Sequence, residues 1–255
     1  MIIEYYRPKT LEEALELLSR TDLAARPLGG GTALTRPSPD HYVAVDLQDL
    51  GLDDIQARGK MLSLGATVTL QRLQSIQGIP RALVEATRHE ATYNLRQVAT
   101  VAGTLVACDG RSSFTTVMLA LDARLLIHPG EEQTSLGDLL HLRSERLHRR
   151  LITNINIPLN ADLAYAYVAR SPADQPIVCV GAARWPSGRT RLAIGGYGET
   201  PMMVFDGTEP SGAETAASDA YSHAGDEWAS ADYRREIVSI LTRRCLKELN
   251  NGDRK

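Results

Sequence analysis

The sequence predicts an α+β protein, and three features of its pattern lead to that class. Apolar residues recur at helical spacing between residues 11 and 18, which indicates an early amphipathic helix. Residues 42–47 are apolar and β-branched, as in a buried strand. From residue 164 onward, three strand-like runs precede one last helix. The chain therefore begins as a small α/β unit and ends as a sheet with a helix packed on it.

Helices and strands alternate through the first 158 residues. Thr10-Leu11-Glu12-Glu13 has the form of a capping box and starts the first helix. Residues 61–68 form the next predicted strand, and Pro80 suits the first turn of a helix running toward Arg88. Residues 100–109 are small and lack helical periodicity, so a loop is expected there. A helix over 115–122, a strand over 123–127 and an alternating strand over 151–157, ended by Pro158, complete this part.

The last third of the chain has a different pattern. Strands are predicted over 164–170, 177–184 and 191–196, and they suggest a separate sheet. Residues 206–227 are rich in Gly, Ser, Ala and acidic residues, which favours a surface loop. The final helix begins near Asp232, and its apolar face should pack on that sheet; the face consists of Tyr233, Ile237, Ile240, Leu241, Cys245 and Leu249.

These patterns divide the chain near residue 158. The first domain covers residues 1–158, with subdomains of about 1–50 and 51–158, and a smaller domain follows over 159–250. A chain of 255 residues with 43% hydrophobic content is long enough to bury the cores that this division requires.

The charge balance excludes some classes of partner. A net charge of −3 leaves no basic surplus to neutralise a phosphate backbone, so nucleic-acid binding is not expected. The most apolar run, residues 117–127, contains Asp122 and Arg124 and is too short to span a bilayer. Glu4 and Arg7 interrupt the start of the chain before a signal-type apolar stretch forms. We expect a cytoplasmic protein without a membrane span.

The cysteines also favour a cytoplasmic protein. Cys108, Cys179 and Cys245 are odd in number and far apart, which suits a reducing compartment. They have no C-x-x-C spacing, and the histidines have no metal-ligand spacing, so no metal site is predicted. The sequence also lacks a nucleophile and base pattern, so no catalytic side chain is predicted.

A first glycine loop, Pro27 to Leu34, follows a predicted strand. Its three consecutive glycines allow backbone N–H groups to converge on an anion without obstruction by a Cβ atom. The loop is not a P-loop, because no Gly-Lys-Ser/Thr follows, and it lacks the G-x-G-x-x-G pattern of a Rossmann fold. A plain turn is the alternative interpretation.

A second loop, Asn94 to Thr104, supplies threonine hydroxyls and small residues at another point of close approach. Taken alone, it is also explained by a packing turn beneath the helix that starts near Thr115.

In this order, the two loops resemble the FAD-binding subunit of the xanthine dehydrogenase and carbon monoxide dehydrogenase family. Residues 28–34 look like the family's Ala-Gly-Gly-x-Ser-Leu loop, and Arg96 followed by Thr100-Val101-Ala102-Gly103-Thr104 is similar to its Arg and Thr-Ile-Gly-Gly-Asn. The resemblance covers nearly the whole chain, because it extends to Tyr6-Arg7-Pro8-Lys9-Thr10-Leu11-Glu12-Glu13-Ala14, to Ala193-Ile194-Gly195-Gly196-Tyr197-Gly198 with Thr200-Pro201, and to Tyr233-Arg234 with Arg243-Arg244.

The resemblance implies a fold and a cofactor. The fold has two α/β subdomains that form an FAD-binding domain of the PCMH type, followed by a smaller α+β C-terminal domain. The diphosphate of the flavin lies between the two loops, which suits backbone donors that neutralise charge without burying a mobile side chain. The implied FAD contacts are Gly29, Gly30, Gly31, Thr32, Ala33, Leu34, Thr100, Val101, Ala102, Gly103 and Thr104.

The sequence departs from the family pattern at three positions. Ala102 replaces a usual glycine, Thr104 a usual asparagine, and Ser113 an aspartate that reaches the nucleotide sugar. If the glycine adopts positive φ, alanine costs roughly 1–2 kcal/mol there. Asp109 is a candidate to replace the missing sugar contact, and an exposed loop aspartate is the alternative.

The implied function is electron transfer within a three-part enzyme. A molybdopterin-containing large subunit oxidises the substrate, a small subunit with [2Fe–2S] clusters relays electrons, and the flavoprotein delivers them to a final acceptor. The flavin ring performs the redox step in such a protein, so no catalytic acid or base is required in this chain.

Two alternatives remain open at this stage. A free-standing flavin reductase of similar fold carries a similar glycine loop, although the C-terminal matches argue against it. A paralogue that keeps the fold as a scaffold without FAD is the other, and the departures at Ala102, Thr104 and Ser113 support it.

Overall fold

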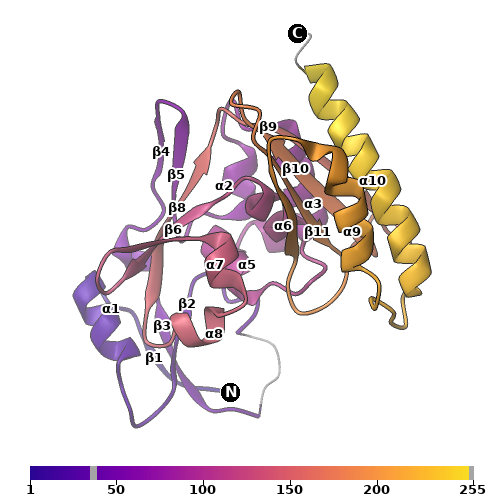
Figure 1. Ribbon diagram of the computed structural model, residues 1–255. Helices are drawn as coiled ribbons and strands as arrows, with labels where there is room; N and C mark the ends of the chain where they lie inside the picture. Colours follow the sequence, from indigo (N-terminus) through magenta and orange to yellow (C-terminus); the bar gives the residue numbers. More distant parts are fainter. Residues whose placement is uncertain (35–38, 253–255) are drawn as a thin grey trace. The chain divides into compact units, whose positions relative to one another are not determined.

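A computed structural model describes residues 1–34 and 39–252 (Figure 1). The chain forms two compact units whose segments interleave along the sequence. The predicted division at residue 158 was continuous, whereas two internal segments of the first 158 residues belong to the second unit. The first unit consists of Met1–Ser75, Tyr93–Ala107 and Arg124–Asn156, and the second of Ile76–Thr92, Cys108–Ala123 and Ile157–Lys255.

The first unit contains a three-stranded parallel sheet in the order β1 (Ile2–Tyr6), β3 (Tyr42–Asp46) and β2 (Ala25–Leu28). Every residue of β3 is buried, which confirms the predicted strand. The helix α1 (Leu11–Leu18) begins as predicted, because Thr10 accepts a hydrogen bond from the Glu13 N–H at 3.2 Å.

A five-stranded sheet forms the rest of the first unit. Its order is β4 (Ile55–Arg58), β5 (Met61–Gly65), β8 (Leu151–Pro158), β6 (Arg124–His128) and β7 (Glu132–Ser135). Short helices connect the strands: η1 (Gln48–Leu50), α2 (Leu70–Gln74), α4 (Tyr93–Arg96), α5 (Val101–Ala107), α7 (Leu136–Leu140) and α8 (Arg143–Arg146).

The predicted loop over residues 100–109 is wrong, because α5 occupies most of it. The helix begins where the Thr100 side chain accepts the Gly103 N–H at 3.1 Å, an N-cap interaction. The helix has only seven residues, and its buried apolar side chains, Val101 and Leu105, are too few to reveal a helical period in the sequence.

The second unit is built on a four-stranded antiparallel sheet. Its order is β12 (Met202–Gly207), β11 (Thr190–Gly195), β10 (Val178–Arg184) and β9 (Asp162–Val168). The three predicted strands are confirmed, and β12 is an addition. Helices α3 (Arg81–Glu90) and α6 (Ser113–Ala120) pack on one side, while α9 (Ala213–Ala220) and α10 (Ala231–Gly252) pack against the same strands (Figure 1).

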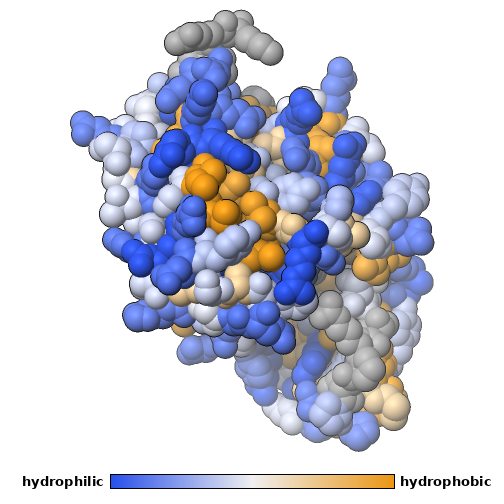
Figure 2. All heavy atoms as spheres, turned by 90° about the vertical axis from the view of Figure 1, so that its right-hand side faces the viewer, coloured by the Kyte–Doolittle hydropathy of each residue, from blue (hydrophilic) through white to orange (hydrophobic). Residues whose placement is uncertain are grey.

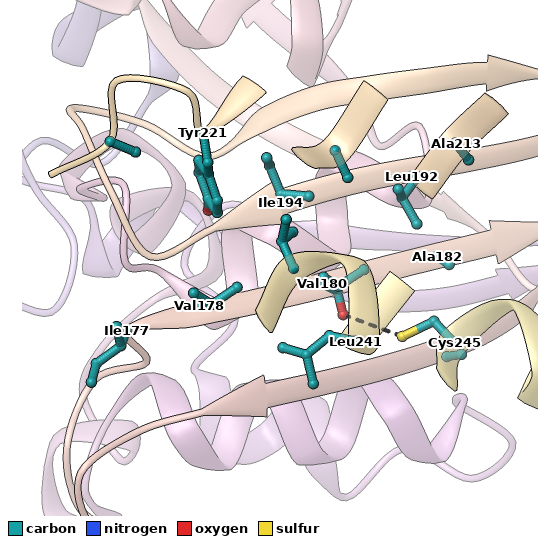
Figure 3. Close-up of a cluster of buried hydrophobic side chains, with 14 of the residues drawn as sticks. Ile177, Val178, Val180, Ala182, Leu192, Ile194, Ala213, Tyr221, Leu241 and Cys245 are labelled. Atoms are coloured by element: carbon teal, nitrogen blue, oxygen red, sulfur yellow. Dashed lines mark hydrogen bonds between the residues drawn. The ribbon is translucent and has the colours of Figure 1, made fainter. Parts of the chain in front are cut away.

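Strand alternation explains how both faces of β10 are buried. Val178, Val180 and Ala182 join the apolar core beneath α9 and α10 (Figure 3). Cys179 instead contacts Thr116 on α6 at 3.5 Å. Helices therefore cover both faces of β10, which matches its nearly continuous apolar sequence, buried at every residue but Arg184.

The predicted surface loop over residues 206–227 is also wrong, because α9 lies within it. Ala213, Ala217, Tyr221 and Ala224 are buried at intervals of three or four residues, the period of a helix face. Alanine contributes little to a hydropathy pattern, so the apolar face of α9 could not be recognised among the surrounding polar residues of the sequence.

The final helix α10 is confirmed, and Leu241, Cys245 and Leu249 of its predicted face are buried in the core; the prediction is wrong at Tyr233. Tyr233 is 40% exposed, whereas the neighbouring Arg234 is fully buried, with Val238 and Leu241 behind it. The outward side of α10 carries charged residues, and the face seen in Figure 2 is mainly hydrophilic with an apolar patch among the polar side chains.

Arg234 fastens α10 to three other segments. Its guanidinium makes two hydrogen bonds of 2.9 Å to the Asp226 carboxylate. It also donates to the backbone carbonyls of Ile177, Gly196, Ala224 and Ala229. A buried charge is tolerated here because all of these acceptors surround it.

Replacing Arg234 should destabilise the second unit more than a change at any exposed position. Arg234→Met keeps an unbranched side chain but leaves the Asp226 carboxylate and the carbonyls without their donor, at a cost of about 3–5 kcal/mol. Urea unfolding measures the loss. Arg235→Gln, on the exposed side of the same helix, is the matched control and should change stability by less than about 0.5 kcal/mol. Similar losses in the two variants would contradict the role of Arg234.

Candidate functional site

The first glycine loop leaves the parallel sheet at the end of β2. Leu28 still pairs with Asp46, and its carbonyl accepts the Leu47 N–H at 3.0 Å. Gly31 then has φ of +74°, a left-handed conformation that glycine adopts without strain. The loop ends where the Leu34 carbonyl accepts a hydrogen bond from the Tyr42 hydroxyl. Residues 29–34 are all partly exposed.

The second segment is held by its own hydrogen bonds. Thr100 is buried and forms an isolated antiparallel bridge with Thr69. Its hydroxyl accepts the Gly103 N–H, and its carbonyl accepts the Thr104 hydroxyl at 2.8 Å. Thr100 thus sets where α5 begins.

The structure brings these two predicted segments into direct contact. A Cβ atom on Gly30 would lie 1.6 Å from the Val98 carbonyl oxygen, so only glycine fits. A Cβ atom on Gly29 would lie 2.8 Å from the Thr100 hydroxyl oxygen. The first loop therefore rests with its backbone against the second, and the absence of side chains makes this possible.

The N–H groups of the two segments differ in availability. In α5, Val101 donates to the Val68 carbonyl at 2.8 Å and Ala102 to the Ala66 carbonyl at 3.3 Å. The N–H groups of Gly103 and Thr104 are taken by Thr100. In contrast, the N–H groups of four first-loop residues donate no hydrogen bond within residues 1–34 and 39–252: Gly29, Gly30, Thr32 and Ala33.

These observations fit a diphosphate on the first loop. Four backbone N–H groups lie within residues 29–33, which are partly exposed. Gly29 and Gly30 have no Cβ atom that would obstruct the approach of an anion. The second segment has no such donors left at residues 101–104 and supports the first. Contacts from Val101, Ala102 and Gly103 to a ligand would have to use other atoms than their N–H groups.

The strain expected at Ala102 is absent. Ala102 lies inside α5, and the non-glycine residues with positive φ among those described are Asp122, Glu131 and Arg149. Because alanine is the best helix former, it suits this position better than glycine. The departure at Thr104 is accommodated as well, since its hydroxyl bonds to the backbone one turn earlier.

The other two predicted positions lie in the second unit. The Asp109 carboxylate is exposed and accepts the Arg111 backbone N–H at 2.8 Å, which is a turn interaction. Ser113 is fully buried on α6, and its hydroxyl accepts a hydrogen bond from the Tyr165 hydroxyl at 2.8 Å.

A carboxylate that the sequence did not indicate lies at the start of α6. Glu90 accepts hydrogen bonds from the Ser112 hydroxyl at 2.8 Å and from the Phe114 N–H at 2.9 Å. Burial raises the pKa of Glu90 to about 7, although these two bonds oppose the shift. A glutamate in the last turn of a helix gives no sequence signal for this role, because its partners lie more than 20 residues away.

The described residues contain no group of His, Cys, Asp and Glu side chains arranged to hold a metal ion. No helix in the described part of the chain has both the length and the apolar character to cross a membrane.

Comparison with known proteins identifies the family. Residues 1–160 match the family described as FAD binding domain in molybdopterin dehydrogenase. The chain therefore belongs to this family of flavoproteins, and the resemblance, the cofactor FAD and the assignment to an oxidoreductase component are confirmed at that level.

Individual relatives extend the match along the whole chain. The chain is 31% identical over 247 residues to the uncharacterized protein YgfM of Escherichia coli, with 94% of each chain covered. It is 24% identical to the glyceraldehyde dehydrogenase medium chain of Sulfolobus acidocaldarius, covering 96% of this chain and 97% of that one. The fold matches quinoline 2-oxidoreductase from Pseudomonas putida with a TM-score of 0.80 at 23% identity, over 98% and 97% of the two chains. The predicted α+β fold, with its FAD-binding domain of the PCMH type, is confirmed.

The raised pKa of Glu90 predicts a pH dependence of stability. A carboxyl group whose folded pKa lies near 7, against 4.5 when unfolded, stabilises the fold at low pH and loses that contribution as pH rises toward 7. The loss amounts to about 3 kcal/mol in total. Glu90→Gln keeps an acceptor for Ser112 but does not titrate.

Urea unfolding from about pH 5 to pH 8 measures this effect as the difference between variant and wild type, which removes the contribution of other groups. The variant should gain stability relative to wild type as pH rises. A difference that stays constant across this range would show that the carboxyl of Glu90 titrates normally.

Proposed function

We propose that this chain is the FAD-binding, electron-transferring subunit of a molybdopterin-dependent dehydrogenase. The observation that carries the proposal is the backbone contact between Gly30 and Val98, beside which the N–H groups of Gly29, Gly30, Thr32 and Ala33 donate no hydrogen bond to any other described residue. Four such donors suit a dianionic diphosphate, because they offer hydrogen bonds without bringing a competing charge.

The residues divide the work of holding FAD. Gly29, Gly30, Thr32 and Ala33 supply the backbone donors, and Thr32 adds a hydroxyl. Thr100 and the Val98 carbonyl fix the position of that loop. When bound, the isoalloxazine ring of FAD supplies the capacity to accept and release electrons. The chain contributes binding and orientation.

We further propose a large molybdopterin subunit and a small [2Fe–2S] subunit as partners. The relatives support this, since they include a glyceraldehyde dehydrogenase medium chain and a nicotine 6-hydroxylase medium subunit, each matched over at least 96% of its length. A medium subunit implies a larger and a smaller one. A cytoplasmic location is part of the proposal, because none of the three cysteines forms a disulfide.

The two alternatives are less well supported. A free-standing reductase does not explain a match to medium chains that continues to the C-terminal unit. A scaffold without FAD was suggested by Ala102, Thr104 and Ser113. The first two fit α5 without strain, whereas Ser113 is buried and bonded to Tyr165, so its departure still stands for that alternative.

FAD should bind much more tightly than FMN, because FMN lacks the diphosphate that the first loop would hold. Thr100→Val removes the hydroxyl that caps α5 and lies beside Gly29, so FAD binding should weaken about five- to tenfold. Thr100→Ser keeps the hydroxyl and should bind like wild type. Fluorescence titration measures each dissociation constant, and circular dichroism confirms that each variant is folded.

Equal affinities for FAD and FMN would reject the diphosphate assignment. An unaffected Thr100→Val variant would reject the supporting role of the second segment. Gly30→Ala is a poorer test, because its Cβ atom would displace the Val98 carbonyl and disturb the fold directly.

The purified chain alone should not oxidise an aldehyde, a purine or an N-heterocycle, whereas its flavin absorbance should bleach when substrate and both partner subunits are present. The reason is that substrate oxidation belongs to a partner in this proposal. Co-expression with the neighbouring reading frames, followed by size exclusion and anaerobic spectroscopy, tests it. Turnover of such a substrate by the single chain would instead favour a free-standing reductase.

A further inference from the structure

Tyr42 links the parallel sheet of the first unit to the first glycine loop. It begins β3, and strand alternation places it on the face opposite Val43 and Val45, which join the apolar core beneath α1. Tyr42 is only 2% exposed, and its hydroxyl donates a hydrogen bond to the Leu34 carbonyl. The hydroxyl therefore holds the last residue of the loop.

The ring of Tyr42 also contacts the strand that leads into the loop. The Cζ atom of Arg26, on β2, lies 4.7 Å from the ring centroid. The same guanidinium makes a hydrogen bond of 3.3 Å to the Asp40 carboxylate, so Arg26 is tied to the residues just before β3. Tyr42 thus contacts the strand before the loop through its ring and the end of the loop through its hydroxyl.

The loop is attached at its start, in its middle and at its end. Its start pairs with β3, Gly30 rests on the segment before α5, and Leu34 is bonded to Tyr42. Thr32 and Ala33 lie between the last two attachments and donate no backbone hydrogen bond within residues 1–34 and 39–252. Because their own N–H groups do not fix them, the bond at Leu34 limits where these two donors lie.

We propose that Tyr42 is a positioning residue for binding of the FAD diphosphate. This inference rests on the proposed function, and Tyr42 acts through the loop, by holding the N–H groups of Thr32 and Ala33 in one arrangement before the cofactor binds. Donors that are fixed in advance lose less conformational entropy on binding, so they bind a dianion more tightly. Without the hydroxyl, the cofactor itself must order this half of the loop. The hydrogen bond, and not the aromatic ring, carries the effect.

The test compares flavin binding by variants of the purified full-length chain. Tyr42→Phe keeps the ring and its contact with Arg26 but removes the hydroxyl, so the dissociation constant for FAD should rise about five- to tenfold. The preference for FAD over FMN should fall by a similar factor, because only FAD carries the diphosphate that the loop would hold. 4-Aminophenylalanine in place of Tyr42 keeps an N–H donor at the same position of the ring and should restore tight FAD binding.

Tyr221→Phe is the matched control, because the Tyr221 hydroxyl is also buried and donates to a backbone carbonyl, that of Gly195 in the second unit, at 2.8 Å. It should lower stability in urea as Tyr42→Phe does, and leave both flavin affinities unchanged. FAD binding by Tyr42→Phe that equals wild type, an equal loss in Tyr221→Phe, or no recovery with 4-aminophenylalanine would overturn the role of Tyr42. Absence of FAD binding by the wild-type chain would reject the proposed function, and this inference with it.

Discussion

The packing of two segments of the first unit depends on Gly30, whose Cα lies too close to the Val98 carbonyl to carry a side chain. A Cβ atom there would penetrate the Val98 carbonyl, so glycine alone permits the loop after β2 to lie on the segment before α5. The N–H groups of residues 101–104, at the start of α5, donate to the carbonyls of Val68 and Ala66 and to Thr100. In the first loop, Gly29, Gly30, Thr32 and Ala33 are partly exposed, and their N–H groups donate no hydrogen bond within residues 1–34 and 39–252. One loop is thus suited to binding, and the other to holding it in place.

In the second unit, glycines again allow two backbone segments to pack closely, here a helix on a sheet. A Cβ atom on Gly181 would lie 3.2 Å from the backbone of α6, and one on Gly195 would lie 2.4 Å from the Thr116 hydroxyl oxygen. Gly196 has φ of +126° and donates its N–H to the Gly110 carbonyl at 2.6 Å. The Ala193 to Gly198 run of the sequence is therefore a packing motif: its glycines let α6 and the chain before it approach the strands.

The sequence predicted best those features that depend on pattern within one segment. The capped helix after Thr10, the buried strand over residues 42–47 and the C-terminal sheet all appear in the structure. It failed at α9, where alanines carry the packing and leave no apolar stripe, and at α5, which is too short to show a helical period. The Glu90 carboxylate could not be predicted either, since its environment is made by residues of α6 that only the fold brings near. The first glycine loop appears as predicted, whereas most of the second is the helix α5, whose N–H groups bond to carbonyls of distant segments that the sequence does not reveal.

That distinction changes the meaning of the departures from the family pattern. From the sequence alone, Ala102 and Thr104 argue against FAD binding, because the family's glycine and asparagine at these positions were expected to contact the diphosphate. In the structure, the N–H groups of both residues bind carbonyls of their own unit, so a ligand does not depend on them. Alanine then strengthens α5, and the Thr104 hydroxyl ties it to Thr100. Substitutions in the supporting segment are tolerable as long as they preserve the backbone on which Gly30 rests. The same reasoning makes Gly30 the position at which no other residue is acceptable, because any side chain there would separate the two loops.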